Sequence, residues 1–184
     1  MFKRIYLFSM ILIFAFLLIV GMKASADTDT MTPIFDGKVD PKLKFQSCHG
    51  WKDLPITEWS VLEANAPWVM KKFKSRKSSY TEENWVSGNP PNAPYKMVTI
   101  ESWSFEYPED AGLYPETNVL TSSTVFPGWA KTADIGDKTC WLTPFDMFFV
   151  KNKTLVRVFV SPLQIDDATK NYTRKIAESI CKKL

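Results

Sequence analysis

The last third of the chain constrains the fold most, because three short apolar runs separated by turns lead into one two-faced helix. The runs are Cys140–Leu142, Met147–Val150 and Leu155–Val160, with a tight turn at Lys151–Lys153. Short apolar runs joined by such turns are typical of antiparallel strands. The sequence therefore predicts a three-stranded meander over residues 140–160.

A helix is predicted to follow the meander, capped by Asp166 or Asp167 and continuing to the C-terminus. Its apolar side chains recur at helical spacing, at Tyr172, Ile176, Ala177, Ile180 and Leu184. Because a helix with one apolar face must bury that face, we expect it to pack across the sheet. The predicted fold class is α+β: a single domain with an antiparallel sheet and the C-terminal helix packed across one face.

The middle of the chain is less regular. Alternation of side chains predicts a strand over residues 97–107, and a further strand is predicted over residues 119–126. Asn65 followed by Pro67 predicts a helix start, whereas residues 54–63 fit either a helix start or a strand. Residues 78–95 contain Gly88 and three prolines, so a turn-rich connection is predicted there.

The first 26 residues predict a cleavable signal peptide. Lys3 and Arg4 precede an apolar run, and Ala24-Ser25-Ala26 offers signal peptidase small side chains. An uncleaved membrane anchor is the alternative, and both place the folded domain outside the cytoplasm. We expect a periplasmic or secreted protein that is not integral to the membrane after cleavage, with a poorly ordered lead-in at 27–44 and one globular domain at 45–184.

The charge balance argues against a nucleic-acid partner. The chain has 23 Lys and Arg against 20 Asp and Glu, and three of the basic residues but no acidic one lie in the predicted signal peptide. The mature chain is thus formally neutral, whereas nucleic-acid-binding domains carry basic patches.

Three cysteines remain in the mature chain: Cys48, Cys140 and Cys181. In an oxidising compartment two of them are expected to pair. A disulfide between Cys48 and Cys181 is favoured, because the ends of a domain often lie close together. Cys140 with Cys181 is the nearest alternative, and three buried free thiols are another.

The segment over residues 134–184 combines a Gly136-Asp137 pair, Trp141, a hairpin over 149–156 and a final helix ending Ala177 to Leu184. In this combination it resembles the closing segment of small extracytoplasmic bacterial proteins with a Mog1/PsbP-like α/β fold. The chain departs from the pattern in its Lys-Asn-Lys turn and in Cys140. The resemblance implies a fold and a compartment, and no single activity.

No catalytic, cofactor-binding or metal-binding residue is predicted. His49 is the only histidine, and Cys48 beside it is in a poor position for a nucleophilic pair, because such pairs usually meet through the fold. The sequence holds none of the nucleotide, metal or serine-hydrolase motifs that carry a mechanism. Acidic residues occur in predicted turns, where carboxylates usually cap backbone groups: Glu106, Glu109, Asp110, Asp134 and Asp137.

A partner-binding site is predicted between Trp85 and Tyr95, where aromatic rings flank a stretch that includes Pro90 and Pro91. A loop stiffened by proline loses little entropy on binding, and amphipathic rings are common in interfaces. The alternative is that Trp85 and Tyr95 fold back as lids on the core.

The predicted function is non-enzymatic binding in the periplasm or cell envelope, with a protein or an envelope component as partner. A periplasmic immunity or inhibitor protein is a narrower form of this function. Two alternatives stay open: an enzyme whose site is built from dispersed Asp, Glu, Tyr or Ser residues, and a structural accessory subunit of an envelope assembly.

Overall fold

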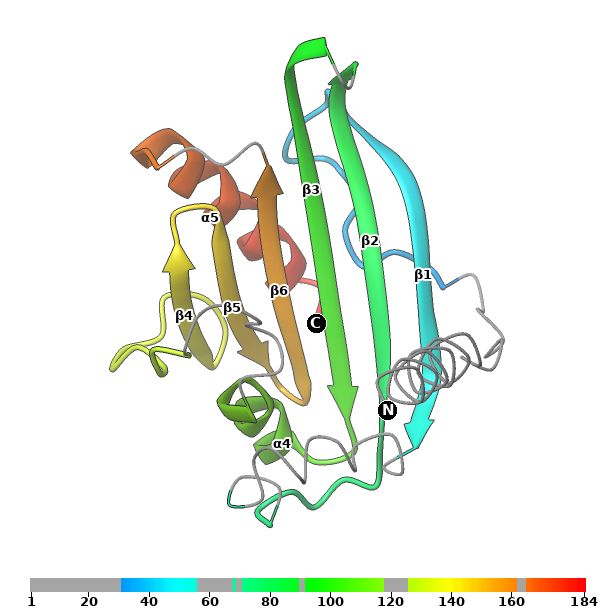
Figure 1. Cartoon of the computed structure of the whole chain (residues 1–184), viewed down its shortest axis with the longest axis vertical. Helices are drawn as coiled ribbons and strands as arrows, with labels where there is room; N and C mark the ends of the chain where they lie inside the picture. Colours follow the sequence, from blue (N-terminus) through cyan, green and yellow to red (C-terminus); the bar gives the residue numbers. More distant parts are fainter. Residues whose placement is uncertain (1–30, 56–67, 69–70, 90–91, 118–125, 162–164) are drawn as a thin grey trace, which may run out of the picture.

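The computed structural model describes residues 31–55, 68, 71–89, 92–117, 126–161 and 165–184. The described elements form an antiparallel sheet with two α-helices and a 3-10 turn (Figure 1). In chain order they are β1 (Leu43–Pro55), β2 (Lys77–Asn89), β3 (Asn92–Phe105), α4 (Pro108–Leu113), η2 (Tyr114–Thr117), β4 (Lys138–Thr143), β5 (Asp146–Lys151), β6 (Thr154–Ser161) and α5 (Asp167–Cys181). The predicted α+β class is confirmed.

The sheet consists of two antiparallel meanders placed side by side. The strand order is β1-β2-β3-β6-β5-β4, so β3 and β6 join the meanders at the centre. The predicted C-terminal meander is confirmed as β4, β5 and β6. The turn between β5 and β6 places Asn152 at a φ of 55°, and the Asp137 carboxylate accepts a hydrogen bond of 2.7 Å from the Asn152 N–H.

The turn-rich connection predicted over 78–95 is wrong, because most of that stretch forms β2 and the start of β3. The two strands pair from Ser78 opposite Phe105 to Asn89 opposite Asn92. Glycine and proline cluster at the hairpin end, while the rest of β2 is mostly polar and places one aromatic residue on each face, Tyr80 and Trp85. Long strand pairing overrides the local turn signal here. The predicted strand over 119–126 and the predicted helix start at Asn65 lie mostly or wholly outside the described residues.

One face of the sheet is covered by α5 and by the N-terminal segment. The Asp166 carboxylate caps α5 by accepting a hydrogen bond of 2.6 Å from the Thr169 N–H. The apolar face of α5 is buried, and Figure 1 shows the helix behind β5 and β6. Ile176, Ala177 and Ile180 of α5 belong to a core cluster to which Trp141 of β4 packs and which also holds strand residues: Leu43, Trp85, Val98, Ile100, Met147, Phe149, Val156, Val158 and Val160. The predicted helix packing is thus confirmed.

Residues 31–42, which we call the strap, are well packed, so the poorly ordered lead-in predicted over 27–44 is wrong for this part. Phe35 is 1% exposed, and the centroid of its ring lies 5.1 Å from that of the Trp85 ring. The Tyr172 hydroxyl donates to Asp40 across 2.9 Å, and the Lys183 ammonium donates to the Ile34 carbonyl across 3.2 Å. The polar composition of the strap did not indicate order, because the contacts that order it are made with residues distant in the sequence. The domain therefore begins before Phe45.

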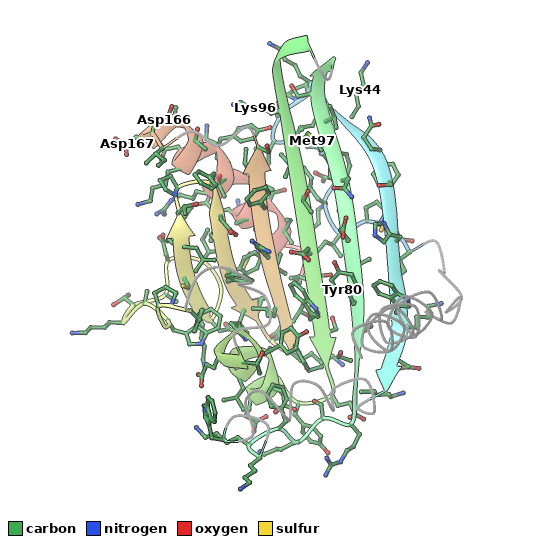
Figure 2. All side chains as sticks on the ribbon, viewed as in Figure 1. Lys44, Tyr80, Lys96, Met97, Asp166 and Asp167 are labelled. Carbon is green, nitrogen blue, oxygen red and sulfur yellow. The ribbon has the colours of Figure 1, made fainter. Side chains whose placement is uncertain are left out.

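On the opposite side of the sheet, α4 and η2 are the described elements that cover one end. Ala111 of α4 packs against a second apolar cluster that includes Trp103, Phe105, Phe148 and Leu155. We call the remainder of this side the open face. It comprises Lys44, Ser47, His49, Trp51, Tyr80, Glu82, Asn84, Met97, Thr99, Glu101, Asp146, Arg157 and Phe159. Figure 2 shows the side chains of the sheet from this side, with Tyr80 and Met97 labelled.

Candidate functional site

Of the predicted partner-binding residues Trp85, Pro90, Pro91 and Tyr95, the structure describes the side chain of Trp85 alone, and that side chain is buried. Trp85 is 7% exposed and packs between Phe35 and Phe45 on the covered face, with ring centroids 5.1 and 5.3 Å away. It is a core residue because its position in β2 points it toward the strap. Pro90 and Pro91 lie outside the described residues, as does the side chain of Tyr95, although its backbone belongs to β3.

Neighbouring Cys48 and His49 point to opposite faces of the sheet, as successive strand residues do. Cys48 stands opposite Glu83 on the covered face, whereas His49 stands opposite Glu82 on the open face. The thiol and the imidazole therefore cannot form a nucleophilic pair. Burial, together with the charge of Glu83, raises the pKa of the Cys48 thiol to about 11.

All three cysteines are free thiols in the structure. Cys140 belongs to the apolar cluster beneath α4, and Cys181 packs against the cluster beneath α5. The sheet separates these two residues, so a Cys140–Cys181 bond does not fit this fold. Cys48 and Cys181 share the covered face but are unpaired, and a bond between them stays a prediction for oxidised protein.

The acidic residues of the predicted turns hold local structure. The buried carboxylate of Asp110 accepts hydrogen bonds from the N–H groups of Lys74 and Ser75, the second at 2.6 Å. The other four are also engaged: Glu106 with the Arg76 N–H, Glu109 with Lys74, Asp134 with Arg174, and Asp137 with the Asn152 N–H. These contacts are consistent with capping roles, and none of the five residues belongs to the open face.

The open face carries a row of four polar side chains on four strands, and the buried Phe148 continues the row on a fifth strand. His49, Glu82, Glu101, Arg157 and Phe148 stand directly opposite one another on β1, β2, β3, β6 and β5. The adjacent row holds Asn84, Thr99, Phe159 and Asp146. Antiparallel pairing alone brings these residues together, since each comes from a different strand.

Arg157 is the cation of this row, and two carboxylates hold it. Its guanidinium donates to both oxygens of Asp146, at 2.9 and 2.8 Å, and to Glu101 Oε2 at 3.2 Å. Burial disfavours the charged form, but the bonds to Asp146 and Glu101 outweigh it and raise the pKa of Arg157. The guanidinium carbon also lies 5.4 Å from the Phe148 ring and 5.6 Å from the Phe159 ring. Arg157 is therefore fixed in place as well as charged.

Tyr80 connects the carboxylates of Glu82 and Glu101. Its hydroxyl lies 3.2 Å from Glu82 Oε2 and 3.0 Å from Glu101 Oε1. Burial, with the charges of Glu101 and Glu82, raises the pKa of Tyr80 far above its ordinary value. The phenol is therefore protonated at neutral pH and acts as a hydrogen-bond donor.

Among the described contacts, Arg157 donates to Glu101 and not to Glu82, so the negative charge of Glu82 is the less neutralised of the two. Asn84 donates to its Oε1 at 2.9 Å, and His49 Nε2 lies 3.6 Å from its Oε2. The Glu82 side chain is 30% exposed and that of Glu101 is 20% exposed, so both reach solvent. A ligand on this face would touch them.

Aromatic rings border the carboxylates at the end toward α4. Trp51 stacks on Tyr80 with centroids 5.3 Å apart and an interplanar angle of 26°. Trp103 lies on the other side of Tyr80 at 5.2 Å. Trp103 is buried, whereas Trp51 and Tyr80 are partly exposed. Partly exposed rings beside charged groups supply both apolar area and polar contacts, as interface residues do.

Sequence reasoning missed this site. Its signal was the alternation Tyr80-Thr81-Glu82-Glu83-Asn84, which places three polar side chains on one face of a strand. The glycine and prolines nearby favoured turns instead. In the part of the chain that the structure describes, no three His, Cys, Asp or Glu side chains are placed to hold a metal ion.

Comparison of the chain with protein-family models, with curated proteins and with solved structures finds no match.

Proposed function

We propose that the chain is an exported, non-enzymatic binding protein of the periplasm or cell envelope, and that its open face receives the partner. The partner is a protein or an envelope component. A periplasmic immunity or inhibitor protein is the narrower form of this proposal, and a toxin gene beside the gene for this chain would favour it.

The observation that carries the proposal is the position of Glu82 directly opposite Glu101. Like charges at directly opposed positions destabilise an antiparallel pair. The described contacts offset only part of this cost, because Arg157 reaches Glu101 and not Glu82. Residues that break a local rule of stability without an evident structural gain are expected at functional sites. The pair is therefore better explained by binding than by folding.

The chemistry of the row supports binding over group transfer. Arg157 is held by Asp146 and Glu101, and Tyr80 keeps its proton. These groups present fixed donors, acceptors and charge, which orient a ligand. The thiol of Cys48 faces the other side of the sheet, away from them.

The proposal of export rests on residues 1–26, which the structure does not describe. None of the described helices has the length and apolar character needed to cross a membrane. An Asp27 N-terminus in exported protein, measured by intact mass, would support cleavage. A product that keeps Met1 and sediments with membranes would support an anchor.

The test of whether the open face binds the partner uses a steric variant and a matched control. Thr99→Trp places a large ring in the centre of the open face, and Lys175→Trp places the same ring on the exposed side of α5. Each mature variant is used to capture partners from the envelope extract of the source cell. We expect Thr99→Trp to lose the captured partner and Lys175→Trp to keep it. Retention by a folded Thr99→Trp variant would move the docking surface elsewhere.

A further inference from the structure

We propose that the open face docks a basic polypeptide segment, with an arginine or lysine side chain of the partner against Glu82 and Glu101. The inference rests on the proposed function, since it names the chemistry of the partner that this face receives. It is carried by the charge and the hydrogen-bond donors of the face, and by the rings beside it.

The charges of the face do not balance. Its described side chains include three carboxylates, Glu82, Glu101 and Asp146, against the guanidinium of Arg157 and the ammonium of Lys44, which lies opposite Val86 near the start of β1. Arg157 already binds two of the carboxylates, so the negative charge concentrates toward Glu82. A surface of this sign attracts cationic partners and repels anionic ones.

Among the described contacts, the open face also has fewer hydrogen-bond donors than the oxygens of Glu82 and Glu101 require. The Tyr80 hydroxyl has one hydrogen but faces two acceptors, Glu82 Oε2 and Glu101 Oε1, so it donates to one at a time. Among the described contacts, Asn84 and Arg157 donate to the other oxygens of these two carboxylates. At 3.6 Å, His49 Nε2 is beyond hydrogen-bonding distance of Glu82 Oε2.

Within the described part of the chain, one carboxylate oxygen is therefore always left for a further donor. Water can supply that donor, but a cationic N–H group also neutralises the charge and makes a stronger bond. A guanidinium offers several N–H groups in one plane and can reach both carboxylates.

The rings favour the same ligand. Trp51 and Tyr80 form a stacked pair directly beside Glu82 in the sheet. A guanidinium or ammonium group over such a ring gains cation–π attraction. Met97, 37% exposed on the same side of β3, offers apolar contact to the rest of a bound segment. Acidic groups, rings and an exposed methionine along one face suit a peptide better than a lone inorganic cation.

The test measures binding of a fluorescein-labelled oligo-arginine peptide to the mature protein by fluorescence anisotropy, at low and at raised salt. The variants are Glu82→Gln and Glu82→Lys. The matched controls are Glu178→Gln and Glu178→Lys, because Glu178 is a partly exposed residue of α5 on the other side of the sheet. Circular dichroism confirms that each variant is folded.

We expect Glu82→Lys to weaken peptide binding by about tenfold or more and Glu82→Gln by about threefold to tenfold, with changes under about twofold in the controls. Equal losses in the Glu82 and Glu178 variants would mean that only net charge matters, and would overturn the inference. Absence of binding to the wild-type protein would overturn it too.

Partner capture separates this inference from the proposed function. If Thr99→Trp abolishes capture while Glu82→Lys leaves it unchanged, the open face is the docking surface but the partner is not basic. If neither variant changes capture, the proposed function itself is wrong. Loss in both variants supports both.

Discussion

The side chain of Glu83 in β2 accepts a hydrogen bond of 2.5 Å from the backbone N–H of Ile34 in the strap. Its second oxygen accepts from the Phe35 N–H at 3.2 Å and from the Trp85 indole N–H at 3.3 Å. A fully buried carboxylate with three donors thus fastens the strap to the covered face. The side chain of Glu82, the preceding residue, lies on the open face. Two adjacent glutamates therefore point to opposite sides of the sheet.

Glu83→Gln is expected to lower the free energy of unfolding by about 1–3 kcal/mol. Glutamine has one acceptor oxygen where the three N–H donors now meet two, and its own NH₂ group would face a donor. Denaturant unfolding measures the change, with Glu178→Gln as the control, which should shift stability by less than about 0.5 kcal/mol. An unchanged midpoint for Glu83→Gln would show that the strap does not depend on this carboxylate.

The pH dependence of stability should carry a signature of Glu83. Burial outweighs the hydrogen bonds of Ile34, Phe35 and Trp85 and raises the pKa of Glu83 above its ordinary value of 4.5. The folded protein therefore binds this proton more tightly than the unfolded chain, so the contribution of Glu83 to stability is fully present below pH 4.5. It is lost as the pH rises through the folded-state pKa.

The difference in unfolding free energy between wild type and Glu83→Gln isolates this group, because other carboxylates titrate alike in both proteins. The difference should shrink as the pH increases above 4.5. A difference that grows over that range would mean that the hydrogen bonds outweigh burial and that the sign is reversed.

Trp85→Ala is expected to cost about 3–5 kcal/mol of stability, the range for removing a large aromatic residue from a core. The change also removes the ring that packs on Phe35 and Phe45 and the N–H that reaches Glu83. Partner capture, normalised to folded protein, should be unchanged, because Trp85 lies on the face away from Glu82. A stable variant that has lost its partner would instead restore the stretch from Trp85 to Tyr95 as the binding site.

Oxidised protein should keep Cys140 as a free thiol. Burial, with the charge of Asp146, raises the pKa of Cys140 to about 11, and the sheet separates this residue from Cys181. Any disulfide that forms should join Cys48 to Cys181, which would add ~4 kcal/mol in the chain-entropy model for so long a loop. Peptide mapping without reduction reports the pairing, and a peptide containing bonded Cys140 would contradict the topology.

The sequence alone determined the fold of the last third of the chain. The runs over 140–160 have short connections and strong apolar patterns, and α5 carries its own cap and apolar face. Local signals of this kind need no distant partner, so β4, β5, β6 and α5 could be predicted with their approximate boundaries.

Only the tertiary structure decided the remainder. The sequence of β2 is polar and is followed by prolines, so it does not by itself indicate a strand. Pairing with β1 and β3 makes this segment a strand. The strap is ordered by Glu83, Tyr172 and Lys183, which lie far away in the sequence. The row from His49 to Arg157 likewise depends on strand register, which sequence spacing does not reveal. Long-range pairing assigned Trp85 to the core and Glu82 to the open face, although the sequence made Trp85 the candidate for binding.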